Sequence, residues 1–283
     1  MIQDAKAGIV EIQARYPEWQ GISQSGIKLF LEDPGSYRDE RVLRIVPPSR
    51  PTASRQWGLD FEQLVMGQLR VVKIPEDVLS ASGSRAGGNW QTWRDEQLEQ
   101  HGPDVRLYTD KEWDEKMGGM LAAQANIQRH AFAAELIGHG YYWPTYEWID
   151  LETGLPCHAH PDGVYGEDEI VWDLKTAGDI SADGWARDAF KWGYHVQQWW
   201  YCEGVRQNTG HCPAFCFIVV KNSRSWGVEV MELHSEWMEF AGATIRGALQ
   251  RMRIALETDV WDSPTHGRVV TLPAPSWAKF RNR

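Results

Sequence analysis

Two aspartates and a lysine stand close together in the stretch 160–176, which reads HPDGVYGEDEIVWDLKT. Asp162 follows a proline, and Asp173 and Lys175 flank one residue at the end of an apolar run. Side chains two positions apart on a strand point to the same face of a sheet. A magnesium ion held by carboxylates activates a bound water and offsets the charge developing on a phosphate, and a lysine can position that water. The stretch therefore predicts a magnesium-dependent phosphodiesterase.

The text GEDE at 166–169 predicts a turn that folds the flanking segments into a hairpin. Asp162 and Asp173 can then lie side by side at the strand ends. Leu174 points its side chain into the core, but its backbone carbonyl can face the metal. Magnesium binds hard oxygen ligands and keeps several waters, so two carboxylates and one carbonyl suffice. A structural ion pair of Asp173 with Lys175, and a plain Pro-Asp-Gly turn, are the alternative interpretations.

A second polar group lies on the segment 182–206, which predicts a helix. Phe190, Tyr194, Gln197 and Tyr201 follow a spacing of 4, 3 and 4 and would form one stripe. An aromatic stripe is ordinarily core, but a buried glutamine amide needs hydrogen-bond partners. Gln197 and Tyr201 could therefore bond the lysine, a ligand carboxylate or a DNA phosphate.

The elements that must position these residues follow from hydrophobic periodicity and from turn residues. Helices are predicted over 1–20, from Ser25 as the cap to 32, over 56–69, 90–100, 111–138, 182–206 and 234–256. Strands are predicted over 141–150, 155–165, 170–177, 213–222 and 227–233. This order predicts a mixed α/β (α+β) fold, with a central mixed sheet of about five strands flanked by helices.

We expect one nuclease domain over 1–283, because the chain is long enough for one large core. Its parts would be a mainly helical segment 1–140 with an elaborated loop at 75–110, an αβ catalytic core 141–260, and a tail 261–283. No window approaches the roughly 18 apolar residues of a membrane helix, and the N-terminus lacks an apolar secretory segment. The protein is therefore expected to bind no membrane and to act in the cytoplasm.

The net charge of −10 argues against a broad surface that coats nucleic acid. Basic residues nevertheless gather between positions 38 and 55 and in the tail, where Lys279, Arg281 and Arg283 lie, whereas 95–115 is acidic. The candidates for phosphate contacts are Arg38, Arg41, Arg44, Arg50, Arg55, Lys221 and Arg224. Few contacts would make DNA affinity modest and sensitive to salt. A solvated surface of mixed charge is the alternative interpretation.

Three motifs in this order resemble a known family. The PDG at 161–163, the DLK at 173–175 and the Q-x-x-x-Y at 197–201 are similar to the PD-(D/E)xK nuclease superfamily, in its RecB-like branch. More narrowly, the chain resembles the nuclease domain of exonuclease VIII (RecE-type) and its phage relatives. The run 185–204 and the text SGIKLFLEDPGSYRDER at 25–41 carry much of that likeness.

The resemblance implies a magnesium-dependent exodeoxyribonuclease, with manganese as a substitute, that degrades one strand of linear double-stranded DNA 5′ to 3′ in phage or prophage recombination. It implies a ring-shaped homo-oligomer, DNA ends as substrate, a strand-annealing recombinase as partner, and a bacterial host cytoplasm. Asp162 and Asp173 would be the metal carboxylates, Lys175 the catalytic lysine, and Gln197 and Tyr201 the helix motif.

The chain departs from the family at one ligand. Many members place a metal-binding histidine on an early helix in the pattern G-x-x-x-H, whereas here Glu62 follows Gly58 at that spacing. Glu62 and Glu147 are therefore the candidates for an additional ligand. A single-strand or structure-specific nuclease, or a non-catalytic DNA-binding subunit, are the alternative functions. The intact aspartates and lysine argue against the last of these.

Other metals are less well supported by the residues. His158 and His160 share a strand face, but Cys157 would point the opposite way, so a zinc site is not favoured. The spacing of Cys202, Cys212 and Cys216 does not match an iron–sulphur cluster, and we expect none. The four cysteines are expected to be reduced thiols.

Overall fold

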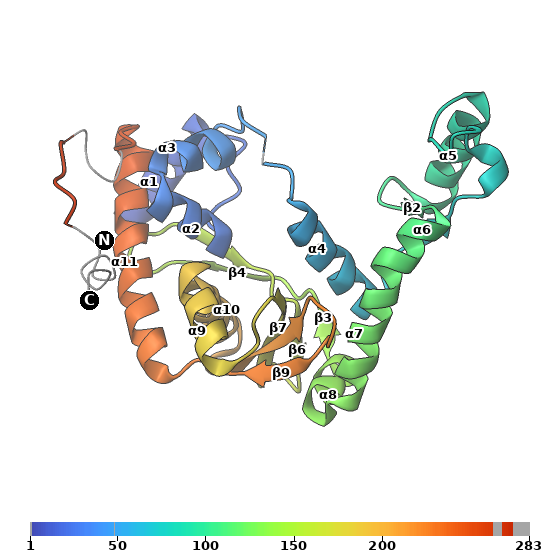
Figure 1. The fold of residues 1–283 in the computed structure, drawn as a ribbon. Helices are drawn as coiled ribbons and strands as arrows, with labels where there is room; N and C mark the ends of the chain where they lie inside the picture. Colours follow the sequence, from blue (N-terminus) through green and yellow to red (C-terminus); the bar gives the residue numbers. More distant parts are fainter. Residues whose placement is uncertain (1, 48, 263–267, 274–283) are drawn as a thin grey trace. The chain divides into compact units, whose positions relative to one another are not determined.

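The computed structural model describes residues 2–47, 49–262 and 268–273 of the chain (Figure 1). It groups the chain into two compact units, one of Met1–Pro48, Glu147–His158 and Glu239–Arg283, the other of Ser49–Tyr146 and Ala159–Met238. The single nuclease domain over 1–283 stays a prediction. The tail residues Lys279, Arg281 and Arg283 lie outside the described residues.

The second unit contains the sheet that the sequence predicts. Its helices are α4 (Ala53–Val65), α5 (Gly88–His101), α6 (Asp110–Glu112), α7 (Gly118–Arg129), α8 (Ala131–His139), α9 (Ala182–Lys191) and α10 (Tyr194–Thr209), with short turns at Glu76–Val78 and Trp113–Met117. Its strands are β1 (Val71–Lys73), β2 (Arg106–Tyr108), β3 (Tyr141–Tyr142), β6 (Gly163–Tyr165), β7 (Ile170–Ala177), β8 (Ala214–Lys221) and β9 (Val228–Met231).

Five of these strands form one mixed sheet in the order β3-β6-β7-β8-β9, which confirms the predicted fold class. β7 and β8 are parallel because the chain crosses over through α9 and α10, and the other neighbours are antiparallel. The hairpin predicted around 166–169 is present, with Gly163 paired to Trp172. One position further along this antiparallel pair, Asp162 lies opposite Asp173.

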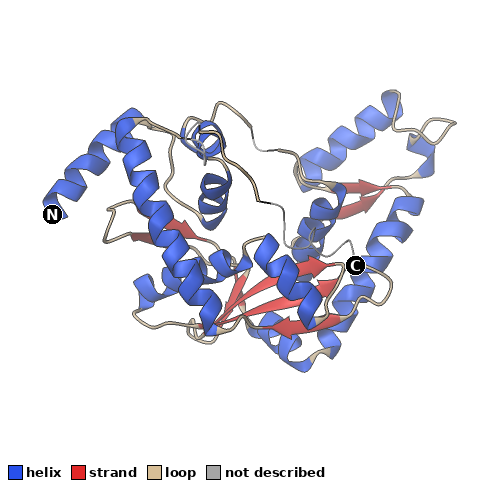
Figure 2. Ribbon diagram, turned by 60° about the vertical axis from the view of Figure 1, so that its left-hand side comes forward, coloured by secondary structure: helices blue, strands red, loops and turns tan. Residues whose placement is uncertain are grey.

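Helices cover both faces of the sheet, with α7 and α8 on one side and α9 and α10 on the other (Figures 1 and 2). Trp172 and Leu174 of β7 join an apolar cluster with Met120, Ile127 and Leu136 of α7 and α8. Asp173, which lies between Trp172 and Leu174 on β7, faces the other side of the sheet. A Cβ on Gly163 would come within 2.1 Å of the Trp172 ring, so only glycine leaves room for the indole.

The first unit consists of helices and a small strand pair. It holds α1 (Ile2–Arg15), α2 (Gln24–Glu32), α3 (Pro34–Tyr37), a π-helical turn at Arg38–Val42, the strands β4 (Tyr146–Ile149) and β5 (Pro156–Ala159), and most of α11 (Ser235–Thr258). Its core includes Ile22, Ile27, Phe30 and Tyr37. The cap of α2 is Ser23, which accepts from the Gly26 N–H, and not Ser25 as predicted.

Several predicted elements are divided in the structure. The predicted strand 155–165 is two strands, β5 and β6, in different sheets, and the strand 141–150 is likewise β3 and β4. The helix predicted over 182–206 breaks at Gly193, which has φ 65°. Phe190 therefore lies on α9 and is 59 % exposed, so it shares no stripe with Gln197. The helix predicted over 111–138 breaks at His130.

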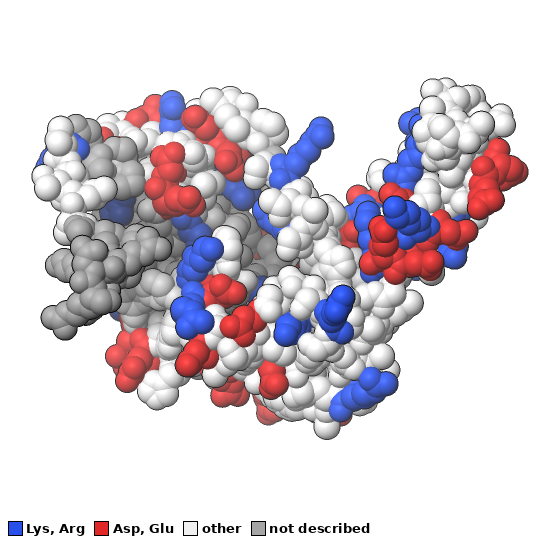
Figure 3. Space-filling model, viewed as in Figure 1, with Lys and Arg blue, Asp and Glu red and all other residues white. Residues whose placement is uncertain are grey.

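The loop predicted over 75–110 contains α5 and β2, and β2 pairs with β1 just before the loop; these two short parallel strands were not predicted. Acidic side chains, with some basic ones among them, gather over α5 and α6 (Figure 3). Within the described residues, none of the helices is both long and apolar enough to cross a membrane.

Candidate active site

The β6–β7 hairpin brings the two predicted aspartates together. The backbone N–H of Leu174 donates to Oδ2 of Asp162 at 2.7 Å, so the Asp162 carboxylate lies against β7. Asp173 is fully buried on the same strand. The strand end thus carries two acidic groups within a low-dielectric surrounding, which is costly unless hydrogen bonds or cations offset the charge.

The glutamine of α10 supplies one of those hydrogen bonds. Nε2 of Gln197 donates to Oδ1 of Asp173 at 2.6 Å and lies 3.2 Å from the hydroxyl of Tyr201. Gln197 and Tyr201 are both buried. Of the partners left open by the sequence, the structure therefore selects a carboxylate for Gln197. Burial and the nearby negative charges of Asp173 and Asp162 raise the pKa of Tyr201, which stays a neutral phenol.

Lys175 supplies the positive charge. Its ammonium pairs with Oδ2 of Asp173 and lies 5.2 Å from the centre of the Tyr194 ring, at the start of α10. Burial alone would lower the pKa of Lys175, but the charges of Asp173 and Asp162 outweigh it and hold that pKa above its ordinary value. The lysine is therefore charged at neutral pH.

Glu62 on α4 is a third carboxylate near Asp162 and Asp173. Oε1 of Glu62 accepts a hydrogen bond from the indole N–H of Trp143 at 3.0 Å. Burial raises the pKa of Glu62, and the charge of Asp173 adds to that rise. Glu62 and Glu147 were the candidates for an additional ligand, and Glu62 is the one that lies in the same unit as the aspartates.

The site is short of positive charge. Burial raises the pKa of Asp162 well above its ordinary value, and the charges of Asp173 and Glu62 raise it further. Lys175 and the Leu174 N–H act in the opposite direction but do not cancel this rise. Three carboxylates thus share one ammonium group, and a cation of higher charge would relieve their repulsion.

The donor set fits magnesium, because carboxylate oxygens are the hard ligands that this ion prefers. In the described part of the chain, no three His, Cys, Asp or Glu side chains are arranged to enclose an ion. The residues that would hold a metal are Glu62, Asp162 and Asp173. A ligand role for the Leu174 carbonyl stays a prediction.

The remaining predicted residues fall in two groups. Glu147, on β4, lies in the other unit, where it lines a hollow with Gln20, Trp148, Ile149, Pro156, Cys157 and His158. The basic candidates in that unit are Arg38, Arg41 and Arg44. Arg38 faces Asp39 and Asp259, at 3.4 and 3.6 Å. Those in the unit of the carboxylates are Arg50, Arg55, Lys221 and Arg224. Their contacts with DNA stay predictions.

Two residues at the site were not predicted to act there. Trp143 contacts Glu62, and Tyr194 contacts Lys175, although Tyr194 had been expected only as part of an aromatic stripe. The sequence does contain a signal near Trp143. Pro144 interrupts an aromatic strand pattern, and a proline at such a place indicates that the chain leaves the sheet there.

Comparison with known proteins places this geometry in a family. A family model described as a PDDEXK-like domain of unknown function (DUF3799) matches residues 96–267, more than half of the chain. The chain belongs to this family. The match contains Asp162, Asp173, Lys175, Gln197 and Tyr201, and it begins after Glu62. Membership of the PD-(D/E)xK superfamily is thereby confirmed.

One solved structure shares the fold. A crystal structure of a protein from Eubacterium rectale, to which an exonuclease activity has been ascribed, aligns with a TM-score of 0.57 at 16 % identity and covers 96 % of each chain. The structure of SSO0001 aligns over 68 % of this chain and 85 % of its own, at 9 % identity and a TM-score of 0.26, too low to support a relation. A comparison with curated proteins found no match.

Proposed function

We propose that the protein is a magnesium-dependent exodeoxyribonuclease that degrades one strand of linear double-stranded DNA, 5′ to 3′. The observation that carries this proposal is the buried Asp173, bonded by Lys175 and Gln197, with Asp162 on the neighbouring strand and Glu62 on α4 close enough to repel it. Such a cluster is costly to fold and useful for phosphodiester hydrolysis, because it can hold a divalent cation and a phosphate together.

The protein's own groups have separate roles in this proposal. A bound magnesium ion would supply Lewis-acid stabilisation of the phosphate and a water of lowered pKa. Asp162, Asp173 and Glu62 would hold the ion. Gln197 fixes the orientation of Asp173, since its amide bonds Oδ1 while Oδ2 faces the Lys175 ammonium. Lys175 would position the attacking water and stabilise the negative charge on the phosphate in the transition state.

The wider biological setting rests on the resemblance to exonuclease VIII and its phage relatives. It supports a role in phage or prophage recombination in a bacterial cytoplasm, a ring-shaped homo-oligomer that encloses DNA, and a strand-annealing recombinase partner. Manganese should replace magnesium, because both ions take oxygen ligands. An acidic protein gains most from enclosure, since it makes few phosphate contacts of its own.

The test uses linear duplex DNA labelled at the 5′ or the 3′ end, with magnesium, manganese or EDTA, beside a covalently closed circle. We expect metal-dependent release of the 5′ label as mononucleotides and no cutting of the circle. Release of the 3′ label would show that the enzyme degrades the strand 3′ to 5′. Cutting of the circle or of single strands alone would favour the alternative nuclease types.

The matched variants are Asp173→Asn and Asp183→Asn. Asp183 is exposed in the first turn of α9 and takes no part in the cluster. The protein with Asp183→Asn should retain full activity, and the protein with Asp173→Asn should lose it while remaining folded. Full activity of the Asp173 variant would refute the proposed site, and no activity of the wild type on any substrate would favour a non-catalytic DNA-binding subunit.

A further inference from the structure

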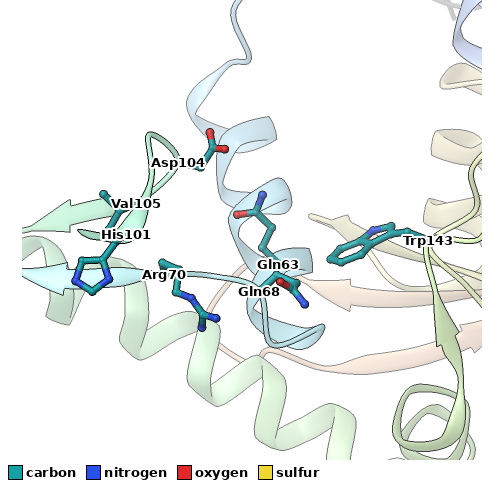
Figure 4. Close-up of a pocket in the computed structure, with 7 residues that line it drawn as sticks. All are labelled: Gln63, Gln68, Arg70, His101, Asp104, Val105 and Trp143. Carbon is teal, nitrogen blue, oxygen red and sulfur yellow. The ribbon is translucent and has the colours of Figure 1, made fainter. Parts of the chain in front are cut away.

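A hollow of about 230 Å³ is lined in part by Trp143, the residue whose indole bonds Glu62. Its lining consists of Gln63, Gln68, Arg70, His101, Asp104, Val105 and Trp143 (Figure 4). Figure 4 shows the Trp143 ring on one side, Arg70 and His101 on the other, and the two glutamine amides between them. Because Trp143 lines the hollow and bonds Glu62, the hollow is one residue away from the proposed metal ligands.

Trp143 joins the hollow to the cluster through two hydrogen bonds. Its backbone N–H donates to the carbonyl of Asp162 at 3.1 Å. Its indole N–H donates to the Glu62 carboxylate at 3.0 Å. Trp143 therefore contacts the carboxylate of Glu62 and the backbone of Asp162, and any change in the position of its ring is transmitted to Glu62.

The backbone of Trp143 is strained. Its φ is 49°, in the left-handed region that bulky residues rarely occupy. Trp143 is nevertheless 38 % exposed, so core packing alone does not account for keeping a tryptophan at this position. Strain that is retained without full burial is a common feature of ligand sites.

We propose that this hollow binds one nucleobase of the strand being cut, stacked on the exposed face of Trp143. The inference rests on the proposed nuclease function and adds the substrate contact that its metal cluster lacks. A hollow of about 230 Å³ is below the usual range for larger ligands, which suits a single flat ring. Aromatic side chains bind bases of any sequence in this manner, because every base has a π-face.

The rest of the lining fits the same ligand. The amides of Gln63 and Gln68 can both donate to and accept from the edge of a base. The Arg70 side chain is exposed and carries the positive charge that an adjoining phosphate requires, whereas Asp104 carries the one negative charge among the lining residues. Seating a base on Trp143 would hold Glu62 in place through the indole N–H. Base recognition and metal binding would thereby be linked.

The experiment compares intact linear duplexes with duplexes that carry one abasic nucleotide at the first, second or third position from the cut end. We expect the wild type to cut one of these positions about tenfold more slowly than the intact duplex, the usual cost of losing one stacked base. Trp143→Ala should be slow by a similar factor on the intact duplex and should show no further loss on the abasic one.

Trp143→Phe separates stacking from the hydrogen bond to Glu62. It keeps an aromatic face, so it should keep the sensitivity to the abasic position, while kcat falls on every substrate alike. Trp192→Ala is the matched control, since Trp192 is 54 % exposed and does not line the hollow. Its rates should equal those of the wild type on all duplexes.

The outcomes distinguish failure of the nuclease function from failure of the nucleobase site. If the wild type cuts no duplex, the proposed function fails. If it cuts but shows no abasic effect at any position, or if Trp143→Ala loses as much on the abasic duplex as the wild type does, the nucleobase site is refuted and the nuclease remains. Should Trp143→Ala fail to fold, a loss of abasic sensitivity in Trp143→Phe would refute it as well.

Discussion

The two faces of β7 have different roles, although their residues alternate along a single strand. Trp172 and Leu174 point into the apolar cluster beneath α7 and α8. Asp173 and Lys175 point toward α10, where Gln197 bonds the carboxylate. Trp172 and Asp173 are equally buried, at 0 % exposure. Depth of burial therefore does not distinguish the stabilising face from the chemical one.

What distinguishes the faces is the effect of burial on each side chain. Burying an apolar ring stabilises the fold by about 1.5–3 kcal/mol. Burying a carboxylate removes its hydration, which the Gln197 amide and the Lys175 ammonium must offset. We therefore expect substitutions on the apolar face to lower stability and those on the charged face to lower activity.

The largest effect should follow from Asp173→Asn. This change keeps the shape and the acceptor for Gln197 but removes one of three crowded negative charges. Activity on linear duplex should fall at least about a thousandfold, because cation binding is lost. Without metal, relief of the repulsion from Asp162 should offset part of the lost ion pair with Lys175, so the free energy of unfolding should fall little. A large loss in denaturant midpoint would mean that the charged face also stabilises the fold.

The second effect belongs to the apolar face. Leu174→Ala should lower the free energy of unfolding by about 2–4 kcal/mol, because it leaves a cavity under α7. Gly163→Ala should also destabilise, since its Cβ would meet the Trp172 ring. Urea unfolding measures both, and kcat below the transition should change little. A selective loss of activity with unchanged stability would break the division between the faces.

The third effect tests the link from α10. Gln197→Leu removes the amide that orients Asp173 and should reduce activity about ten- to a hundredfold, as losses of outer partners at metal sites do. Tyr201→Phe is the matched control, because its hydroxyl bonds Gln197 and its cost should be smaller. The measurement is kcat/KM on the labelled duplex. Equal losses in both variants would show that the phenol has a role of its own.

How much of this site could be predicted depends on how local its parts are in the chain. The hairpin with Asp162, Asp173 and Lys175 was predictable, because a turn between two apolar runs fixes which residues meet. Gln197 was predictable from the need of a buried amide for partners. Its actual partner was not, since which carboxylate it bonds depends on how α10 packs on the sheet.

The failures have physical causes as well. Gly193 breaks the predicted helix through a left-handed backbone conformation, which a glycine permits but does not require, so Phe190 was placed on the wrong helix. β1 and β2 have three residues each, too few to show a strand period. The contact between Glu62 and Trp143 joins positions 81 residues apart, and no local pattern encodes it.

A smaller effect concerns pH and metal. The pKa of Asp162 is raised in the folded, metal-free protein, so the folded state holds a proton that the unfolded chain releases. Metal-free stability should therefore fall as pH rises from the ordinary aspartate pKa of about 4 toward the raised value. Magnesium should offset this fall, so its effect on Tm should grow with pH. Asp162→Asn should flatten both trends, and an unchanged trend in that variant would assign them to other groups.

The smallest effect comes from two tryptophans with the same backbone conformation. Trp143 has φ 49° and Trp226 has φ 46°. Trp226 stacks on Trp57 at 5.7 Å and packs against Gly119, so it belongs to the apolar side of the unit. Asparagine tolerates the left-handed region better than tryptophan does.

Trp226→Asn should therefore cost about 2 kcal/mol or more, because it removes a packed ring. Trp143→Asn should change the free energy of unfolding by less than about 1 kcal/mol, since relief of backbone strain offsets the loss of a partly exposed ring and one hydrogen bond. Thermal unfolding of both variants makes the comparison. Equal losses would mean that Trp143 is held by packing, as Trp226 is. A loss confined to Trp226 would mean that the strain at Trp143 is retained for what binds there.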